Sequence, residues 1–501
     1  MQLTIKSPTR VYFDSNDPLD IQAIEKQLKY VNTANQHALK RHYNMSWFKQ
    51  KNPSAWQSRL EELKSEVNKT TLFQDDSGTY YFRPGSIPHL EGLFSINNEV
   101  KYPVPKKVAW AKPLPFDLYS YQEESVEKLI AIKHGNVQIC TGAGKSAIII
   151  KICRETGFRA AIVAPSTAIF HELLEKFEYH FGRSQVGAFG DGRKSLGKRF
   201  TICIGDSLCN VKRDSPEWEF FSKLDMLMVD ESHTWGADTL ETICHGIFAD
   251  VPYRMFFSAT QTRGDGGEKL LQSIIGQTVV TLTTAEAVAG GYICKHDYTI
   301  VTLESTNPHY QTKEALDMKR AHFLRNKNIA RFIAKLANTV ATTQRRQTLV
   351  LVEELSQIAT LLPLLTVPTA YAHQEKRKDR LAELGIEKVD PLESVEKFNK
   401  GEAMVLIGTS CIATGTNIFP MRHTANWVGG ASEIKTKQGA IGRSVRLGEN
   451  NPWKDKVLPK DEGVTIWDFD VLGIYDMERH LGSRIEYYKE SNSEIRRIKI
   501  L

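Results

Sequence analysis

The sequence predicts an α/β protein in which two tandem parallel-sheet domains follow a small α+β N-terminal domain. At 501 residues the chain is too long for one ordinary domain, so two or three compact units are expected. Short apolar runs alternate with amphipathic stretches through residues 113–295 and again through 296–501, which is typical of buried parallel strands with crossover helices. Residues 1–112 instead mix short strand-like runs with a polar helical stretch.

The N-terminal domain is expected to hold a helix at roughly residues 57–68. It ends in closely spaced prolines, which fit turns and a linker better than a packed helix. These are Pro84, Pro88, Pro103, Pro105, Pro113 and Pro115. Trp47, Trp56 and Trp110 could stack on bases, but a place in the core is the better interpretation of isolated tryptophans.

The strands of the two larger domains are predicted from apolar runs. They are residues 136–140, 160–164, 201–204, 226–229 and 254–257 in the first domain, and 348–352, 404–407 and 464–467 in the second. A helix with one core face is predicted from apolar residues at helical spacing between 329 and 340. The cations beside it (Lys319, Arg320, Arg325, Lys327, Arg331 and Lys335) are interpreted as a solvated face.

Composition limits the class of protein only loosely. A net charge of +6 allows a polyanionic partner without demanding one. The seven cysteines form no Cys-x-x-Cys pair, which favours reduced thiols in a cytoplasmic compartment. No apolar run is long enough to cross a bilayer, and Met1 to Arg10 lacks the apolar core of a signal peptide, so no membrane partner is expected.

A candidate phosphate loop runs from Asn136 to Ser146, as a strand, a Gly-rich turn and a helix start. Gly142 and Gly144 would let backbone N–H groups surround phosphate oxygens, while Lys145 reaches the outer phosphates and Ser146 binds Mg²⁺. The helix N-terminus would add its positive dipole end. Ile139 stands where the usual pattern has its first glycine, and alone the motif fits a nucleotide site and a simple Gly-rich turn equally well.

Two further clusters favour the nucleotide site. Asp230 and Glu231 follow an apolar strand, where ligands of doubly wound sheets bind, so Asp230 is assigned to Mg²⁺ and Glu231 to the hydrolytic water. Arg443 and Arg446 are spaced to share one helix face, and guanidinium groups from another domain suit a developing phosphoryl charge. A strand-end acidic pair or surface arginines would explain each cluster alone, but not all three in order.

At this point the chain resembles the superfamily 2 helicases over residues 118–470. Their motifs occur in order: Leu118 to Gln122, Thr141 to Ser146, Ala164 to Thr167, Gly205 to Ser207, Asp230 to His233, Ser258 to Thr260, Thr409 to Asn417 and Gln438 to Arg446. The resemblance implies two tandem RecA-like domains and a nucleotide site divided between them. It also implies ATP and Mg²⁺ as cofactors.

The resemblance implies further roles, residue by residue. Gln122 would read adenine, and Thr141 and Gly415 would join the nucleotide-binding set. Pro165, Ser166, Gly205, Asp206 and Thr409 would contact the nucleic-acid backbone. Ser258, Thr260 and Gln438 would couple hydrolysis to movement, and His233 is either a relay in that coupling or a plain strand-end histidine. Asn417 stands where many relatives carry an acidic residue.

Within that superfamily the chain resembles the phage UvsW-type helicases. The resemblance rests on residues 325–337, the compact spacing of the last two motifs, Thr465 to Phe469, and Tyr80 to Pro84. It implies a DNA-binding N-terminal domain and ATP-driven 3′→5′ movement that unwinds or branch-migrates forked and recombination intermediates. We expect a monomer in the cytoplasm, which is the host cytoplasm if the protein is phage-encoded, with recombination or replication proteins as possible partners.

Three alternatives stay open. A double-strand translocase that does not separate strands would share every motif, although no nuclease-like cluster is evident outside the motor. An RNA helicase would also share them. A non-hydrolysing nucleic-acid-binding scaffold requires a broken Lys145, Glu231 or Arg443, and all three are intact.

Overall fold

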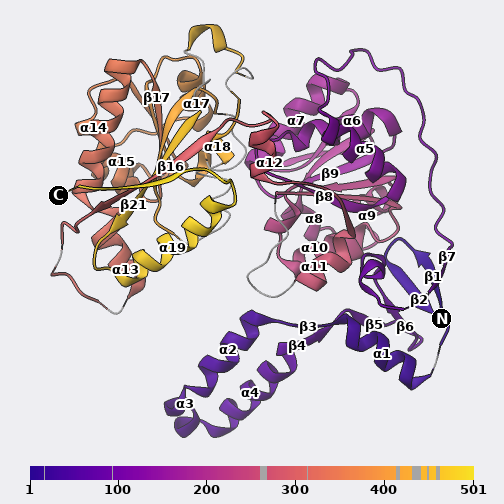
Figure 1. Cartoon of the computed structure of the whole chain (residues 1–501). Helices are drawn as coiled ribbons and strands as arrows, with labels where there is room; N and C mark the ends of the chain where they lie inside the picture. The colour runs from indigo at the N-terminus through magenta and orange to yellow at the C-terminus, as the bar shows by residue number, and fades with distance from the viewer. Residues whose placement is uncertain are drawn as a thin grey trace. The chain divides into compact units, whose positions relative to one another are not determined.

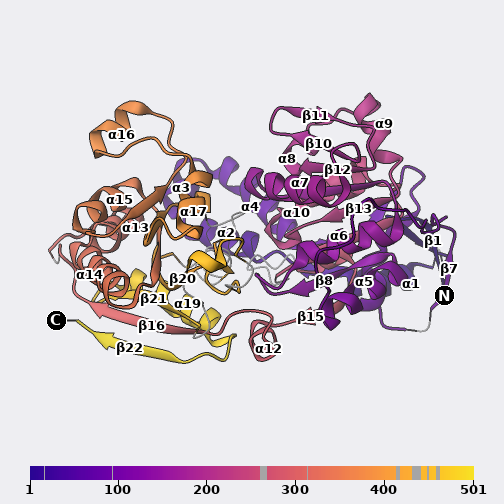
Figure 2. The same ribbon diagram turned by 90° about the horizontal axis from the view of Figure 1, so that it is seen from above.

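The computed structural model describes residues 1–15, 17–92, 94–259, 268–307, 309–312, 314–412, 418–430, 442–447, 451–457 and 463–500. Their contacts divide the chain into two units, Met1–Ile139 with Lys145–Thr281, and Cys140–Gly144 with Leu282–Leu501. The predicted fold class is confirmed, since each unit contains a large parallel sheet and the first also contains a small N-terminal α+β domain (Figures 1 and 2). The domain boundaries at 112 and 295 stay predictions.

The N-terminal domain has a five-stranded sheet, as far as the described residues show, in the order β5-β6-β2-β1-β7. Its strands are β1 (Gln2–Ser7), β2 (Arg10–Phe13), β5 (Leu72–Gln74), β6 (Tyr80–Phe82) and β7 (Ser95–Asn98). Helix α1 (Pro18–Leu28) buries Ile24 and Leu28 in the same core as Leu3 and Phe82. Arg83, buried behind β6, pairs with Glu241 and donates to Ser273 Oγ at 3.1 Å, which fastens this domain to the first large sheet's helices.

An arm, residues 29–70, leaves this domain between α1 and β5. A two-stranded ribbon, β3 (Lys29–Val31) and β4 (Asn68–Thr70), carries α2 (Thr33–Tyr43), α3 (Ser46–Lys51) and α4 (Pro53–Val67) away from the sheet (Figure 1). The helix predicted near residues 57–68 is confirmed as α4, which begins earlier because Asn52 caps it and Pro53 suits its first turn.

The first unit also contains an eight-stranded sheet, counted over the described residues, in the order β11-β10-β12-β9-β13-β14-β8-β15. The strands are β8 (His134–Ile139), β9 (Ala160–Ala164), β10 (Val186–Gly190), β11 (Arg193–Ser195), β12 (Phe200–Ile204), β13 (Met226–Val229), β14 (Tyr253–Ser258) and β15 (Gln277–Leu282). Helices α5 (Ser120–Ile132), α6 (Lys145–Thr156) and α7 (Thr167–Phe181) cover one face (Figure 1). The other face carries α8 (Gly205–Cys209), α9 (Pro216–Ser222), α10 (Ala237–Glu241), the π-helical turn η3 (Thr242–Ile247) and α11 (Glu268–Ile275).

The second unit has a seven-stranded sheet within the described part of the chain, in the order β18-β19-β17-β20-β21-β16-β22. Its strands are β16 (His296–Leu303), β17 (Gln347–Val352), β18 (Thr369–Ala372), β19 (Val405–Gly408), β20 (Met421–Trp427), β21 (Val464–Val471) and β22 (Ile495–Lys499), and Figure 2 shows β22 along β16. Its helices are α12 (Thr284–Ala289), α13 (Ala315–Lys319), α14 (Lys327–Gln344), α15 (Leu355–Leu361), α16 (Lys378–Leu384), α17 (Pro391–Asn399), α18 (Gly442–Ser444) and α19 (Tyr475–Lys489).

Helix α14 confirms the predicted apolar face, because Ile329, Ile333 and Val340 lie in the core. The solvated-face interpretation holds for Arg325, Lys327, Arg331 and Lys335, which are exposed. It is wrong for Lys319, which is buried against Glu353 at 2.6 Å. Arg320 stays partly exposed and pairs with Glu354, its Nε lying 2.7 Å from Glu354 Oε1.

The proline-rich stretch divides into a packed turn at residues 84–89 and an irregular segment at residues 99–119, which we call the strap. Pro84 and Pro88 lie in a 3₁₀ helix, η1 (Pro84–His89), which packs on α11, so the linker interpretation is wrong for these two. Residues 99–119 form no helix or strand and are tied down by Trp110, whose Nε1–H donates to Arg154 O at 3.0 Å. The Arg154 and Arg199 guanidinium groups each lie 5.8 Å from the Trp110 ring centre.

No helix among the described residues is long and apolar enough to span a membrane.

Candidate nucleotide site and its nucleic-acid motifs

The sequence motifs of the first unit gather at one edge of the eight-stranded sheet. Strands β8, β9, β12, β13 and β14 are parallel, so their carboxyl ends lie at the same edge. The phosphate loop follows β8, Asp230 follows β13, and Ser258 ends β14. Ligands of open α/β sheets bind at this edge.

Ile139, which stands where the usual phosphate-loop pattern has its first glycine, lies in the core of the domain. This residue ends β8 with its side chain fully buried, so an apolar group here belongs to the core. Gly142 and Gly144 take φ values of 91° and 79°, a left-handed region that disfavours other residues. Lys145 then begins α6, which sets the helix N-terminus directly after the loop.

The two charged groups expected to act on phosphate and water are ion-paired. Lys145 Nζ lies 3.1 Å from Glu231 Oε1 and 3.3 Å from the carbonyl oxygen of Ile139. Both side chains are buried, and the neighbouring Asp230 is buried as well. Burial and the Glu231 charge raise the pKa of Asp230 to about 7, against the lowering effect of Lys145.

Backbone geometry fixes this acidic pair. Asp230 N–H donates to Val163 O on β9 at 3.0 Å, and Asp230 Oδ1 accepts from Glu231 N–H at 2.9 Å. Glu231 takes φ 47° and ψ 47°, a costly left-handed conformation for a residue with a Cβ. Trp235 Nε1–H donates to Asp230 O at 3.2 Å, so the turn after β13 closes back on the strand end.

The oxygen groups at this edge suit a magnesium ion bound together with phosphates. Among the described residues no three His, Cys, Asp or Glu side chains form a metal cluster. Mg²⁺ in nucleotide sites takes one or two carboxylates and fills its shell with phosphates and water, which fits a buried Asp230 after β13 and the Ser146 hydroxyl at the start of α6, both at this edge. Asp230 and Ser146 would hold the ion, which would neutralise phosphate charge there.

A second ion pair at this edge, between Lys176 and Glu172, was not predicted from the sequence. Lys176 Nζ on α7 lies 3.3 Å from Ser146 Oγ and 2.6 Å from Glu172 Oε1. The Glu172 charge also contributes to the raised pKa of Asp230. Spacing of i and i+4 on an amphipathic helix is typical of surface ion pairs, so the sequence carries no signal that this pair reaches the loop.

Gln122, expected to read adenine, is buried at the start of α5. Its side-chain Oε1 accepts from Tyr119 N–H at 3.0 Å, which caps the helix. The carboxamide therefore has a defined orientation set by the backbone of its own motif. Its contact with adenine stays a prediction.

The predicted nucleic-acid residues of the first unit lie at the same sheet edge. Pro165 and Ser166 follow β9, and Ser166 Oγ caps α7 by accepting from Ile169 N–H at 3.4 Å. Gly205 and Asp206 begin α8 directly after β12. A methyl group at Gly205 would lie 1.9 Å from Trp235 Cη2, so glycine is required there by the same tryptophan that holds Asp230.

In the second unit, Thr409 follows β19, where its N–H donates to Ala372 O at 3.2 Å. Helix α18 covers only Gly442–Ser444, so the expected single helix face for Arg443 and Arg446 is not found within residues 442–447. After this helix Val445 O accepts from Cys294 N–H at 2.7 Å, and within it Ser444 Oγ lies 2.6 Å from Thr424 Oγ1.

Several predicted site residues fall outside what the structure describes. Thr260, Gly415, Asn417 and Gln438 are not among the described residues, and the side chains of His233 and Arg443 are not described. Thr141 lies in the loop itself, within the described part of the chain. The roles assigned to all these residues stay predictions.

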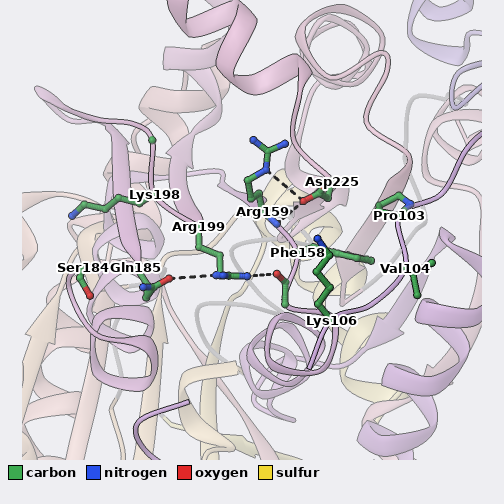
Figure 3. A pocket seen from close by; sticks show the side chains of 12 residues that line it. Pro103, Val104, Lys106, Phe158, Arg159, Ser184, Gln185, Lys198, Arg199 and Asp225 are labelled. Atoms are coloured by element: carbon green, nitrogen blue, oxygen red, sulfur yellow. Dashed lines mark hydrogen bonds and ion pairs between the residues drawn. The ribbon is translucent and has the colours of Figure 1, made fainter. Parts of the chain in front are cut away.

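A cavity of about 590 Å³ lies at the opposite edge of the sheet, beside the first residues of β9 and β12 (Figure 3). Three of its cations, Arg159, Lys198 and Arg199, are bound to other groups of the protein. Arg159 Nε lies 3.6 Å from Asp225 Oδ2, Arg199 donates to Gln185 and Gly157, and Lys198 donates to two backbone carbonyls. The cavity is therefore separate from the motif edge, and of its two arginines Arg199 also contacts the strap, through the Trp110 ring.

Comparison with known proteins finds relatives for part of the chain. Residues 115–263 match the family described as Type III restriction enzyme, res subunit. The chain is 27% identical over 213 residues to the DNA 3'-5' translocase XPB2 of Sulfurisphaera tokodaii, covering 42% of this chain and 46% of that protein. It is 24% identical over 369 residues to Putative helicase 22 of Sulfolobus islandicus filamentous virus, covering 67% and 62%. The chain thus spans about half the length of the first relative and less than two thirds of the second.

Solved structures share the fold. Mss116p bound to ssRNA and AMP-PNP matches with a TM-score of 0.54 at 16% identity, over 77% of this chain and 75% of that one. UvsW of bacteriophage T4 matches over 100% of this chain and 99% of that one, with a TM-score of 0.44 at 14% identity.

The fold is that of two RecA-like domains behind a small N-terminal domain, and the order of the motifs resembles that of the superfamily 2 helicases. The family match over residues 115–263 includes the phosphate loop and the acidic pair Asp230 and Glu231.

Proposed function

We propose that the protein is an ATP-dependent DNA helicase that moves 3′→5′ and unwinds or branch-migrates forked and recombination intermediates. The observation that supports it best is the buried set of Lys145, Glu231 and Asp230 at the carboxyl edge of parallel strands. The relative XPB2 is named as a DNA 3'-5' translocase, which supports DNA as the substrate and 3′→5′ as the direction of movement. Preference for branched DNA rests on the resemblance of the sequence to UvsW-type helicases.

In this proposal Lys145 binds the outer phosphates and Glu231 orients the attacking water. Asp230 and Ser146 hold Mg²⁺, which supplies charge neutralisation at the phosphates. Arg443 and Arg446 stabilise the charge that develops on the transferred phosphoryl group. Pro165, Ser166, Gly205, Asp206 and Thr409 contact the strand through its phosphates, so that tracking is independent of sequence.

A double-strand translocase is the second candidate. Two observations favour it, namely the match to a restriction-enzyme subunit over residues 115–263 and the word translocase in the name of XPB2. Such a motor would hydrolyse ATP on duplex DNA and displace a triplex strand without separating the duplex.

One set of assays separates these functions. ATP hydrolysis is measured without nucleic acid and with single-stranded DNA, duplex, a four-way junction and RNA of the same sequence, and strand and triplex displacement are followed on 3′- and 5′-tailed forks. We expect the largest stimulation by branched DNA and displacement only from 3′-tailed forks. Stimulation by RNA alone would refute the DNA assignment, and triplex displacement without unwinding would select the translocase.

The arginine roles have their own test. Arg443→Ala and Arg446→Ala should each lower ATP turnover by about 10³–10⁵, the worth of an arginine finger, with DNA affinity largely retained. Wild-type turnover in either variant would refute its role.

A further inference from the structure

The tip of the arm, residues 40–51, carries exposed aromatic and cationic side chains. Trp47 is 63% exposed and Tyr43 is 50% exposed, which is unusual for side chains of this size. Lys40, Arg41 and Lys49 are exposed too, as is Lys51. Among the described residues no carboxylate lies within ion-pair distance of these four cations.

The stretch around this tip lacks acidic residues. From Lys26 to Leu60 the sequence contains seven Lys and Arg residues and no Asp or Glu. Two members of this set outside the tip pair with carboxylates beyond the stretch, Lys29 with Glu25 and Arg59 with Glu62. In a chain with 65 basic and 59 acidic residues, such a stretch concentrates positive charge on one projection.

The tip is held in shape by a core of its own. The His42 and Trp56 rings stack at 5.1 Å, His42 Nε2 lies 2.9 Å from Trp56 O, and Trp56 Nε1–H donates to His42 O at 3.3 Å. Leu60 and Leu63 are buried beside them. The sequence-based interpretation that the tryptophans are core residues is therefore confirmed for Trp56 and wrong for Trp47.

We propose that the tip of the arm binds an unpaired DNA strand, with Trp47 stacking on a base and Lys40, Arg41, Lys49 and Lys51 contacting the flanking phosphates. Exposed aromatic rings interleaved with cations are the chemistry that single strands require, because every base has a face to stack on and every linkage carries a charge. This inference rests on the proposed function for its choice of DNA. It adds a binding site separate from the helicase motifs.

The test measures affinity for a forked DNA with a single-stranded tail, without ATP, by fluorescence anisotropy. Trp47→Ala should weaken binding about 5- to 150-fold, the worth of one stacked base, and Trp47→Phe should restore most of it. Tyr475→Ala is the matched control, since Tyr475 is 77% exposed but lies in a helix whose first turn is acidic. Its affinity should equal that of the wild type.

A base analogue and salt dependence test the two parts of the contact separately. A 2-aminopurine in the tail should be quenched by the wild type and less by Trp47→Ala. Lys49→Gln with Lys51→Gln should reduce the slope of log affinity against log salt by about 1.4, or 0.7 for each phosphate contact. Lys489→Gln, an exposed lysine paired with Glu486, should leave the slope unchanged.

The outcomes are distinct. Equal affinities for Trp47→Ala and Tyr475→Ala would overturn the inference, as would a Trp47-dependent dimer in sedimentation with no change in DNA affinity. Wild-type ATP hydrolysis, measured alongside, reports on the proposed function independently of these variants. Equal competition by RNA would keep the strand-binding tip but remove the choice of DNA.

Discussion

Lys145 and Glu231 neutralise each other across 3.1 Å within the buried edge of the sheet. The lysine expected to hold phosphate is thus fixed by the carboxylate expected to orient water. Breaking a buried pair by removing one partner leaves an uncompensated charge, which costs about 3–5 kcal/mol. On the proposed roles, the same contact is expected to affect both stability and catalysis.

Substitutions at this pair should separate the two effects. Glu231→Gln keeps the shape of the side chain, and Asp230 beside it still compensates the Lys145 charge, so ATP turnover is expected to fall by about 10²–10⁴ with a small change in melting temperature. Lys145→Met leaves two adjacent buried carboxylates and should lower both turnover and stability. Phosphate release and thermal unfolding measure the two. A Glu231→Gln protein with wild-type turnover would contradict the role of this residue.

Gly205→Ala should disturb the acidic turn from a neighbouring strand. A methyl group would lie 1.9 Å from Trp235 Cη2, so the indole must move and weaken its hydrogen bond to Asp230 O. We expect a loss of about 1–3 kcal/mol and a lower ATP turnover. Gly482→Ala is the control, since a methyl there meets nothing within 4 Å in helix α19, and it should stabilise by about 0.5–1 kcal/mol. Equal melting temperatures for the two variants would contradict this account.

The second unit depends on a buried ion pair between α19 and β21. Arg484 Nε and Nη2 lie 2.6 and 3.0 Å from the Asp468 carboxylate, Tyr488 Oη donates to it at 2.6 Å, and Arg484 Nη1 donates to Gly430 O. Arg484→Met should cost about 3–5 kcal/mol and lower the melting temperature by about 10 °C. Adding Asp468→Leu removes the stranded charge and should recover much of this loss. Calorimetry of both variants measures these changes in stability. If the double variant were no more stable than Arg484→Met alone, the uncompensated Asp468 charge would not be the cause of the loss.

His423 should make the second unit sensitive to acid. Its Nδ1 accepts from Trp467 Nε1–H at 3.0 Å, which requires a neutral ring, and burial together with Arg422 and Arg346 lowers the pKa of His423 to about 4. An unfolded histidine titrates near 6.5, so this stability is fully present above about pH 6.5. It is lost as the pH falls toward 4, by at most roughly 3 kcal/mol.

The measurement compares unfolding free energies of the wild type and His423→Asn between pH 7 and 4. Asparagine can accept from Trp467 without titrating, so the difference between the two proteins should shrink or reverse as the pH falls. A constant difference over this range would show that His423 does not titrate as described.

Much of the strand pattern is predictable because buried parallel strands are short and apolar. The predicted strands at 160–164 and 226–229 match β9 and β13, and most others differ by one or two residues. Strand β21 continues to Val471, beyond the predicted end at 467, because Asp468 is neutralised by Arg484 from a later helix. Such a partner is invisible to a local pattern, in which an acidic residue indicates a strand end.

The phosphate loop and acidic pair were predictable because their chemistry requires particular residues in a particular order. The contributions of Lys176 and Trp235 were not, since each depends on which helix or turn folds back to the sheet edge. The arm was predicted only in part. Helix α4 was predicted and buries Trp56, Leu60 and Leu63 at helical spacing, whereas α2 and α3 have no such apolar face and were not predicted. The His42–Trp56 contact that joins α2 to α4 is invisible to a local pattern.

Strand register gives the first unit one mechanical property. Val163 on β9 pairs with Cys203 on β12 and with Val229 on β13, so one residue aligns the ends of three strands. The strand ends that lead to Pro165, Gly205 and Asp230 are therefore crosslinked at fixed offsets by backbone hydrogen bonds. Strands joined in this way do not allow their ends to move relative to one another. Any movement driven by ATP therefore has to occur elsewhere in the chain, and these three positions would move as one rigid body.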